Sequence, residues 1–184
     1  LGMGHITSPY TVPFGVMVPQ KVDGLLVPVA VSATHLGFGT LRMEPCWMAM
    51  GQAAGVAANL AIAEQVAPRA VPLRKLQKEL IRQGQVLVHF RDLKWDHENF
   101  EAMQYFAPLG LWQYWQAEPD RAVLRGEAIQ WMEKLGQKVW DRSRPLETLD
   151  WPMLEEWLGK KVKRGSRYYV LRHEFAKTLY DAGY

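Results

Sequence analysis

Between residues 10 and 31 the apolar positions form short runs separated by turn residues. Pro13, Pro19 and Pro28 exclude a continuous helix here, because proline lacks the backbone N–H that a helix interior needs. Two runs, 16–18 and 25–27, are uninterrupted and apolar, and turn signals flank them, which is the pattern of short extended segments. We expect residues 25–27 to form a fully buried strand of the kind found in parallel sheets.

The pattern becomes helical after Glu44. The following stretch is dominated by Ala and Gly and begins with Pro45, a residue favoured in the first helical turn. A helix is therefore predicted from Pro45 to about Glu64. A second, amphipathic helix opens at Pro72, carries leucines on one face and Arg and Lys on the other, and ends at Gly84.

Further helices are predicted beyond residue 90. One covers 96–107 and is closed by Gly110. The segments 123–127 and 170–174 repeat the pattern Val-Leu-Arg-x-Glu 47 residues apart, and each opens a helix that ends near a glycine. Another helix begins at Trp151 between them. A period of this size is typical of repeated helical units.

Charge and aromatic content divide the chain in two. Residues 1–70 contain three basic and three acidic side chains, so the formal net charge of +3 lies entirely in the remainder. Seven of the eight tryptophans also lie beyond residue 90. We therefore expect two domains, 1–88 and 89–184. The small net charge and the lack of a basic stripe with interleaved aromatic residues argue against a nucleic-acid partner.

Residues suited to disulfide, metal or membrane roles are sparse. The single cysteine, Cys46, excludes an internal disulfide and a cysteine-based metal site, and the five histidines lack metal-ligand spacing, so no metal is expected. No signal peptide is visible at the N-terminus. The stretch 46–63 is interrupted by Gln52 and Asn59, so no membrane span is expected either.

The segment 32–45 is the strongest candidate for a site. Small polar residues and glycines lead directly into the helix at Pro45, which has few bulky side chains. Such a helix lets a flat ligand come close, and its first turn presents unpaired N–H groups and positive potential. We therefore predict that this helix entrance faces a cofactor.

The sequence from Tyr10 to Gly84 resembles the C-terminal end of the FAD-dependent oxidoreductases, a family with bacterial members for which secretion or a place in the cell envelope is expected. The resemblance is carried by Pro13-Phe14-Gly15, Val22–Val29, Ser32-Ala33-Thr34-His35, Leu41–Pro45 and Met48–Gly55. It implies an α/β fragment, the last strand and helix of a Rossmann-like FAD-binding domain, followed by a mainly helical small domain. It also implies hydride transfer between a small organic substrate and FAD.

The same resemblance implies that a loop over 33–42 lies along the flavin ring. It places at the cofactor Ser32, Ala33, Thr34, Gly37, Gly39, Thr40, Pro45 and Gln52. His35 is interpreted either as a proton donor or substrate contact near the flavin, or as a structural histidine in a turn. Arg42 either stabilises anionic flavin or substrate, or pairs with Glu44 or with a carbonyl at the end of a strand. A nucleophilic Ser32–His35 pair is not expected, because no acidic third member lies nearby.

The chain lacks the Gly-x-Gly-x-x-Gly turn with which these enzymes bind the ADP part of FAD. The segments 2–7 and 37–39 are most similar to this motif, but neither contains all of its glycines. We therefore expect the N-terminal half of the flavoprotein, from the same gene or another chain, to be a partner. This chain alone is expected to bind FAD weakly or not at all.

Residues 90–184 resemble, more loosely, S-layer-homology repeats, through Phe90-Arg91-Asp92 and the two Leu-Arg-x-Glu segments. This resemblance implies an alternative function, a non-catalytic module that binds cell-wall glycan or another partner. The basic cluster 160–164 is then either a solvated loop or a polyanion site. Likewise, 112–115 is either a platform for sugar stacking or part of the core.

Overall fold

The computed structural model describes residues 9–112, 115–139 and 143–184. The chain divides between Leu87 and Val88 into two compact units, each with its own hydrophobic core. They are called the first and the second unit below, and each is described by itself. The segment 2–7 lies outside the described residues.

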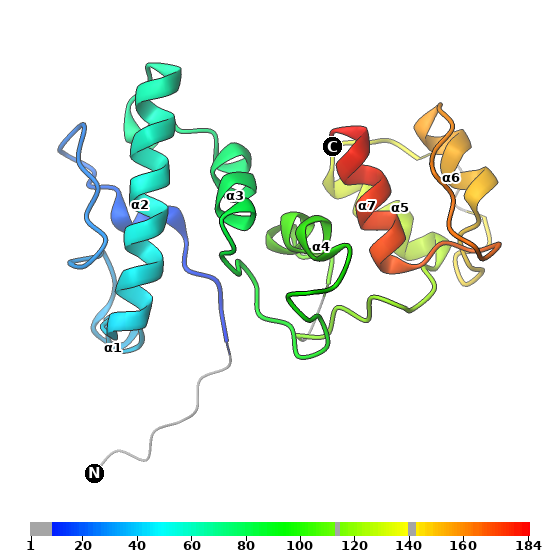
Figure 1. Cartoon of the computed structure of the whole chain (residues 1–184), viewed down its shortest axis with the longest axis horizontal. Helices are drawn as coiled ribbons and strands as arrows, with labels where there is room; N and C mark the ends of the chain where they lie inside the picture. The colour runs from blue at the N-terminus through cyan, green and yellow to red at the C-terminus, as the bar shows by residue number, and fades with distance from the viewer. Residues whose placement is uncertain (1–8, 113–114, 140–142) are drawn as a thin grey trace, which may run out of the picture. The chain divides into compact units, whose positions relative to one another are not determined.

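The first unit is built from helices. Its elements are the 3-10 turn η1 (Phe14–Met17), α1 (His35–Leu41), α2 (Glu44–Glu64), the 3-10 turn η2 (Pro68–Ala70) and α3 (Leu73–Arg82). Figure 1 shows α2 between α3 and the chain that precedes α1. The two predicted helices are confirmed, and the expectation of a mostly helical chain holds.

The ends of α2 follow from its flanking residues. Pro45 occupies its first turn, and Gln65 ends it in the left-handed conformation with a φ of 54°. One side of α2 packs into a small-residue core that includes Ala53, Ala57 and Ala61. By length and composition α2 is also the one described helix that could cross a membrane, a property shared by buried helices of globular proteins.

The expected α/β fragment is wrong, because the described residues of the first unit contain no β-strand. Residues 14–17 form η1, and Leu25, predicted to be buried in a strand, is 45% exposed. The Val27 N–H donates to the Met17 carbonyl at 2.8 Å, and the Ser32 N–H donates to the Val16 carbonyl at 2.8 Å. These isolated bonds do not extend into a ladder, since the described chain offers no second extended segment beside them.

The segment expected as a loop over 33–42 is largely the helix α1. The Thr34 side chain accepts a hydrogen bond from the Gly37 N–H at 3.1 Å and so caps the start of this helix. Arg42 ends α1, and its N–H donates to the Phe38 carbonyl. The local capping interaction therefore prevails over the two glycines within α1 that favour a loop.

The second unit contains α4 (Phe100–Phe106), the 3-10 turn η3 (Ala107–Leu109), α5 (Arg125–Lys134), α6 (Trp151–Leu158) and α7 (Arg172–Ala182). The helix expected from residue 96 begins four residues later, because hydrogen-bonded turns occupy 94–99. Gly110, expected to close this helix, instead ends the η3 turn that follows α4, in the left-handed conformation. Trp112 is buried against Trp131 with ring centroids 4.8 Å apart, so core packing is the correct alternative for that residue.

Three segments of the second unit meet in a closed ring of backbone hydrogen bonds. The Val123 N–H donates to the Val170 carbonyl at 2.9 Å, Val170 to Leu149 at 2.9 Å, and Leu149 to Val123 at 2.8 Å. All three side chains are fully buried, and α5, α6 and α7 each begin two residues after one of them. The repeat recognised twice in the sequence therefore has a third structural copy at residues 149–153.

The three copies cap their helices by two routes. Glu127 and Glu174 accept hydrogen bonds from the backbone N–H of Leu124 and Leu171. In the third copy Asp150 instead accepts from the Met153 N–H at 2.9 Å. This exchange of capping residues explains why a search for the Leu-Arg-x-Glu pattern does not find the third copy.

Candidate functional site

The residues proposed to contact the cofactor lie at α1 and at the start of α2. Ser32, Ala33 and Thr34 form the exposed approach to α1, and Gly37, Gly39 and Thr40 lie on α1 itself. Pro45 is exposed in the first turn of α2. Gln52 stands apart, two turns further along α2, where its side chain donates to Gln83 at 3.3 Å. All of them except Gln52 thus lie on one continuous segment, from the approach to α1 to the first turn of α2.

His35 and Arg42 lie at opposite ends of α1, about 10 Å apart along the helix axis. Both side chains are exposed. Neither the imidazole nor the guanidinium has a partner among the described residues, and the alternative Arg42–Glu44 ion pair is not formed. Both groups are therefore available to a ligand.

Thr40 joins α1 to neighbouring segments. Its hydroxyl donates to the Gly37 carbonyl at 2.8 Å and makes a hydrogen bond with the Tyr10 hydroxyl, while its own carbonyl accepts from Cys46 Sγ at 3.8 Å. Tyr10 comes from a segment 30 residues away, so its place beside α1 could not be read from the local pattern.

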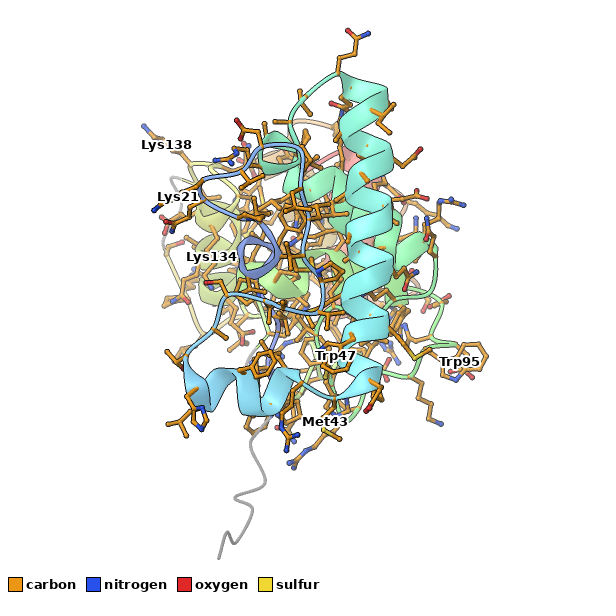
Figure 2. All side chains as sticks on the ribbon, turned by 90° about the vertical axis from the view of Figure 1, so that its left-hand side faces the viewer. Lys21, Met43, Trp47, Trp95, Lys134 and Lys138 are labelled. Carbon is orange, nitrogen blue, oxygen red and sulfur yellow. The ribbon has the colours of Figure 1, made fainter. Side chains whose placement is uncertain are left out.

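The entrance of α2 combines apolar surface with an uncapped helix end. Met43, the residue that precedes α2, is 51% exposed and makes no side-chain cap. Figure 2 shows Met43 and Trp47 where α2 begins, next to α1. A Cβ added at Gly39 would meet no atom within 4 Å. An exposed apolar rim, open space and the positive end of a helix suit a planar ring with an electron-rich edge.

The outward face of α2 carries no charge between Glu44 and Glu64. Met48 and Ile62 on this face are 75% and 79% exposed. Gly51 and Gly55 lie between them, and a Cβ at either would meet nothing within 4 Å. A helix face that remains in water normally carries charged side chains, so this one has the character of a covered surface.

The second unit has a hollow of about 750 Å³ along α7. It lies between that helix, the loop after α6 and the residues that precede α4. Its lining includes five basic side chains, which are Lys160, Lys161, Lys163, Arg164 and Lys177. Thr178 also lines it, is 8% exposed, and has no hydrogen-bond partner among the described residues for its hydroxyl.

Glu155 holds the basic loop in place. This carboxylate is 6% exposed and accepts from Arg164 Nε at 3.1 Å and from Lys161 Nζ at 2.9 Å. The hydrogen bonds from Arg164 and then Lys161 lower its pKa to about 2. The loop is therefore a fixed structure, which the sequence pattern of consecutive basic residues does not reveal. In the part of the chain that the structure describes, no cluster of side chains could hold a metal ion.

One comparison with known proteins gives a match, and this match concerns the first unit. Residues 3–80 match the family model described as FAD dependent oxidoreductase, and the match lies wholly within the first unit. No curated protein and no solved structure matches the chain. The second unit lies outside the family match, so its resemblance to S-layer-homology repeats stays a prediction. The first unit is thus similar to flavin-dependent oxidoreductases, and the cofactor of the matched family is FAD.

Proposed function

We propose that the first unit supplies one wall of the flavin site in a FAD-dependent oxidoreductase and that the rest of the FAD-binding domain covers its exposed apolar surface. The observation that carries the proposal is the uncharged outward face of α2, which continues into the apolar entrance at Met43. The family match over residues 3–80 supports FAD as the ligand of this surface.

Apolar exposure is concentrated in the first unit. Twelve of the fifteen exposed large hydrophobic side chains among the described residues belong to it, and three belong to the second unit, which is of similar length. A surface of this kind on a soluble protein marks an interface. Because the chain lacks the glycine turn that binds ADP, the partner that fits is the remainder of the FAD-binding domain.

FAD, when bound, supplies the flavin nitrogen that accepts or releases hydride. The chain's own residues would hold and polarise the ring. The approach to α1 and α1 itself, from Ser32 to Thr40, would lie along the ring. The positive end of α2 at Pro45 would stabilise negative charge at the edge of the ring. Arg42 would add a full positive charge at the end of α1, and His35 would hold or move a proton for the substrate.

The decisive experiment compares two substitutions on α2 in the complete flavoprotein. Gly55→Leu adds bulk in the centre of the outward face, whereas Ala63→Leu adds it at an exposed position near the end of the helix. We expect Gly55→Leu to lower the ratio of FAD to protein at least tenfold and Ala63→Leu to leave it unchanged. Equal FAD content in both variants, measured by flavin absorbance, would contradict the proposal.

A second candidate function concerns the second unit alone, as a binding module for acidic cell-wall glycan. The observation that favours it is the hollow along α7, where Glu155 fixes a lysine-rich loop and the Thr178 hydroxyl is left without a partner. A charge reversal at Lys163, in the hollow, should weaken binding of the chain to an acidic polysaccharide. The same reversal at Lys138, exposed and outside the hollow, should not.

A further inference from the structure

Each structural copy of the repeat meets the next at a junction, and an arginine closes two of the three junctions. At the α5–α6 junction, Nη1 of Arg125, the first residue of α5, lies 3.2 Å from Glu147 Oε2, and its Nη2 lies 3.8 Å from Asp150 Oδ2. At the α7–α5 junction, Arg172, the first residue of α7, donates to Glu127 at 2.9 Å. Both junctions therefore join a guanidinium to a carboxylate.

The third junction, between α6 and α7, has the carboxylate but not the arginine. The first residue of α6 is Trp151, which is 3% exposed and donates from Nε1 to the Arg167 carbonyl at 3.0 Å. The carboxylate of α7 that corresponds to Glu127, 47 residues earlier in the repeat, is Glu174. An indole N–H at the start of α6 thus replaces the guanidinium that this carboxylate would need.

The second arginine partner of Glu127 has no counterpart either. Glu127 accepts from Arg121 Nη2 at 2.6 Å, and the residue 47 positions after Arg121 is Tyr168. Oε2 of Glu174 accepts the capping bond from the Leu171 N–H at 2.9 Å. No group in the part of the chain that the structure describes donates to Oε1 of Glu174 or forms an ion pair with it. The position that two guanidinium groups occupy in one copy is therefore open in the other.

The hollow along α7 opens at this carboxylate. Glu174 and Thr178, one turn apart on α7, both line it. Thr178 is 8% exposed, and its hydroxyl has no hydrogen-bond partner among the described residues. The walls are held without a ligand, because Glu155 fixes the basic loop and the Asn99 side-chain nitrogen lies 2.7 Å from His173 Nδ1. Two adjacent polar groups are thus left unsatisfied in a preformed hollow.

Charge in the hollow is divided between the two signs. Three of its five basic side chains form ion pairs with carboxylates of the second unit. Lys160 and Lys163, both exposed, have no ion-pair partner among the described residues. The carboxylates of Glu98 and Glu174 also line the hollow. A ligand that carries a cation and an anion satisfies both sets of groups.

We propose that the hollow binds a small zwitterionic ligand whose guanidinium takes, at Glu174, the place of the arginine that closes the other two junctions. A planar guanidinium matches a carboxylate and has further N–H groups for the Thr178 hydroxyl to accept, and Lys163 would hold the carboxylate of the ligand. This cation subsite does not depend on the flavin function of the first unit. It also differs from binding of acidic glycan, which requires only the lysines.

The test titrates the full chain with L-arginine, the simplest compound with both groups, in a calorimeter. We expect saturable binding at millimolar arginine. Glu174→Gln should weaken it at least about tenfold, because the charge is lost while glutamine can still accept the capping bond. Glu156→Gln, exposed and outside the hollow, should bind like the wild type. Absence of saturable binding to the wild type, or equal affinity of Glu174→Gln, would overturn the proposal.

A second measurement uses the wild-type chain and does not rely on the folding of a variant. In NMR spectra, arginine should shift the backbone amide signals of residues 171–178 and 163–165 and leave those of α5 in place. Agmatine, which is arginine without its carboxylate, should bind more weakly and shift residues 171–178 alone. Shifts spread evenly over the second unit would contradict a site at Glu174. Binding of an acidic polysaccharide without binding of arginine would reject the cation subsite and leave the glycan function standing.

Discussion

At the scale of single residues, Gly165 occupies a position where an added side chain would displace the Glu174 carboxylate. A Cβ built there would lie 1.8 Å from Glu174 Oε1, whose carboxylate caps α7. Gly165→Ala should therefore displace the Glu174 carboxylate and destabilise the second unit by about 1–3 kcal/mol. Urea unfolding followed by tryptophan fluorescence measures the change. The exposed neighbour Ser166→Ala is the control and should unfold like the wild type.

Glu155 gives the second unit a measurable response to acid. Its folded pKa of about 2 lies below that of the unfolded chain, so its contribution is present above about pH 4.5 and is lost as the pH falls towards 2. We expect Glu155→Gln to destabilise the protein at pH 6 and the difference from wild type to shrink steadily below pH 4.5. Glu156→Gln, on the exposed side of α6, should cause no such change. A difference that stays constant between pH 6 and pH 2.5 would refute the role of this carboxylate.

At the scale of elements, Arg172 connects two copies of the repeat. It is 7% exposed in its side chain, donates to the Glu127 carboxylate at 2.9 Å and to the Ala117 carbonyl at 3.2 Å, and lies over the Trp131 ring. Arg172→Met should destabilise the second unit by about 3 kcal/mol. This is the lower end of the destabilisation caused by removing one partner of a buried ion pair, because Glu127 is partly exposed and still forms its ion pair with Arg121.

Thermal unfolding of Arg172→Met beside Arg167→Met distinguishes this role from a general effect of losing charge. Arg167 is exposed, and its side chain has no ion-pair partner among the described residues. Equal melting temperatures for the two variants would show that the connection between copies contributes nothing.

The helices could be predicted where the capping residues and the period of the apolar positions both indicate a helix within the same short stretch of sequence. Pro45 and the segment after Glu64 define α2, and the Leu-Arg-x-Glu pattern marks the starts of α5 and α7. The apolar run at Leu25 was misleading, since such a run becomes a strand only when a neighbouring strand completes its hydrogen bonds. The sequence of a short apolar run does not show whether such a neighbouring strand exists.

The candidate site was predictable only in part, for a related reason. The approach to α2 could be recognised because its residues are contiguous. The partners of Arg172 and of Asn99 come from positions 45 and 74 residues away, and the contact between Tyr10 and Thr40 spans 30. Contacts over such separations are set by packing, which periodicity and motif spacing do not encode.

At the scale of the whole molecule, the first unit should not retain the cofactor by itself. The glycine turn for ADP is missing from the sequence, and the surface at Met43 is open to solvent. Purified alone, the chain should carry far less than one FAD per molecule, and titration with FAD should give weak binding or none. Stoichiometric flavin in the isolated chain would refute the need for a partner. The complete flavoprotein, prepared in parallel, is the positive control.

The ring of hydrogen bonds that joins Val123, Leu149 and Val170 constrains how the second unit folds during its synthesis on the ribosome. Val170 is synthesised last of the three, and α7 must follow it before Phe175 and Leu179 can fill the core. Until then the nascent chain exposes the tryptophans of α5 and α6 without the segment that buries them. The second unit should therefore stay open during most of its translation and close in one late step, which makes this interval the period when chaperones matter most.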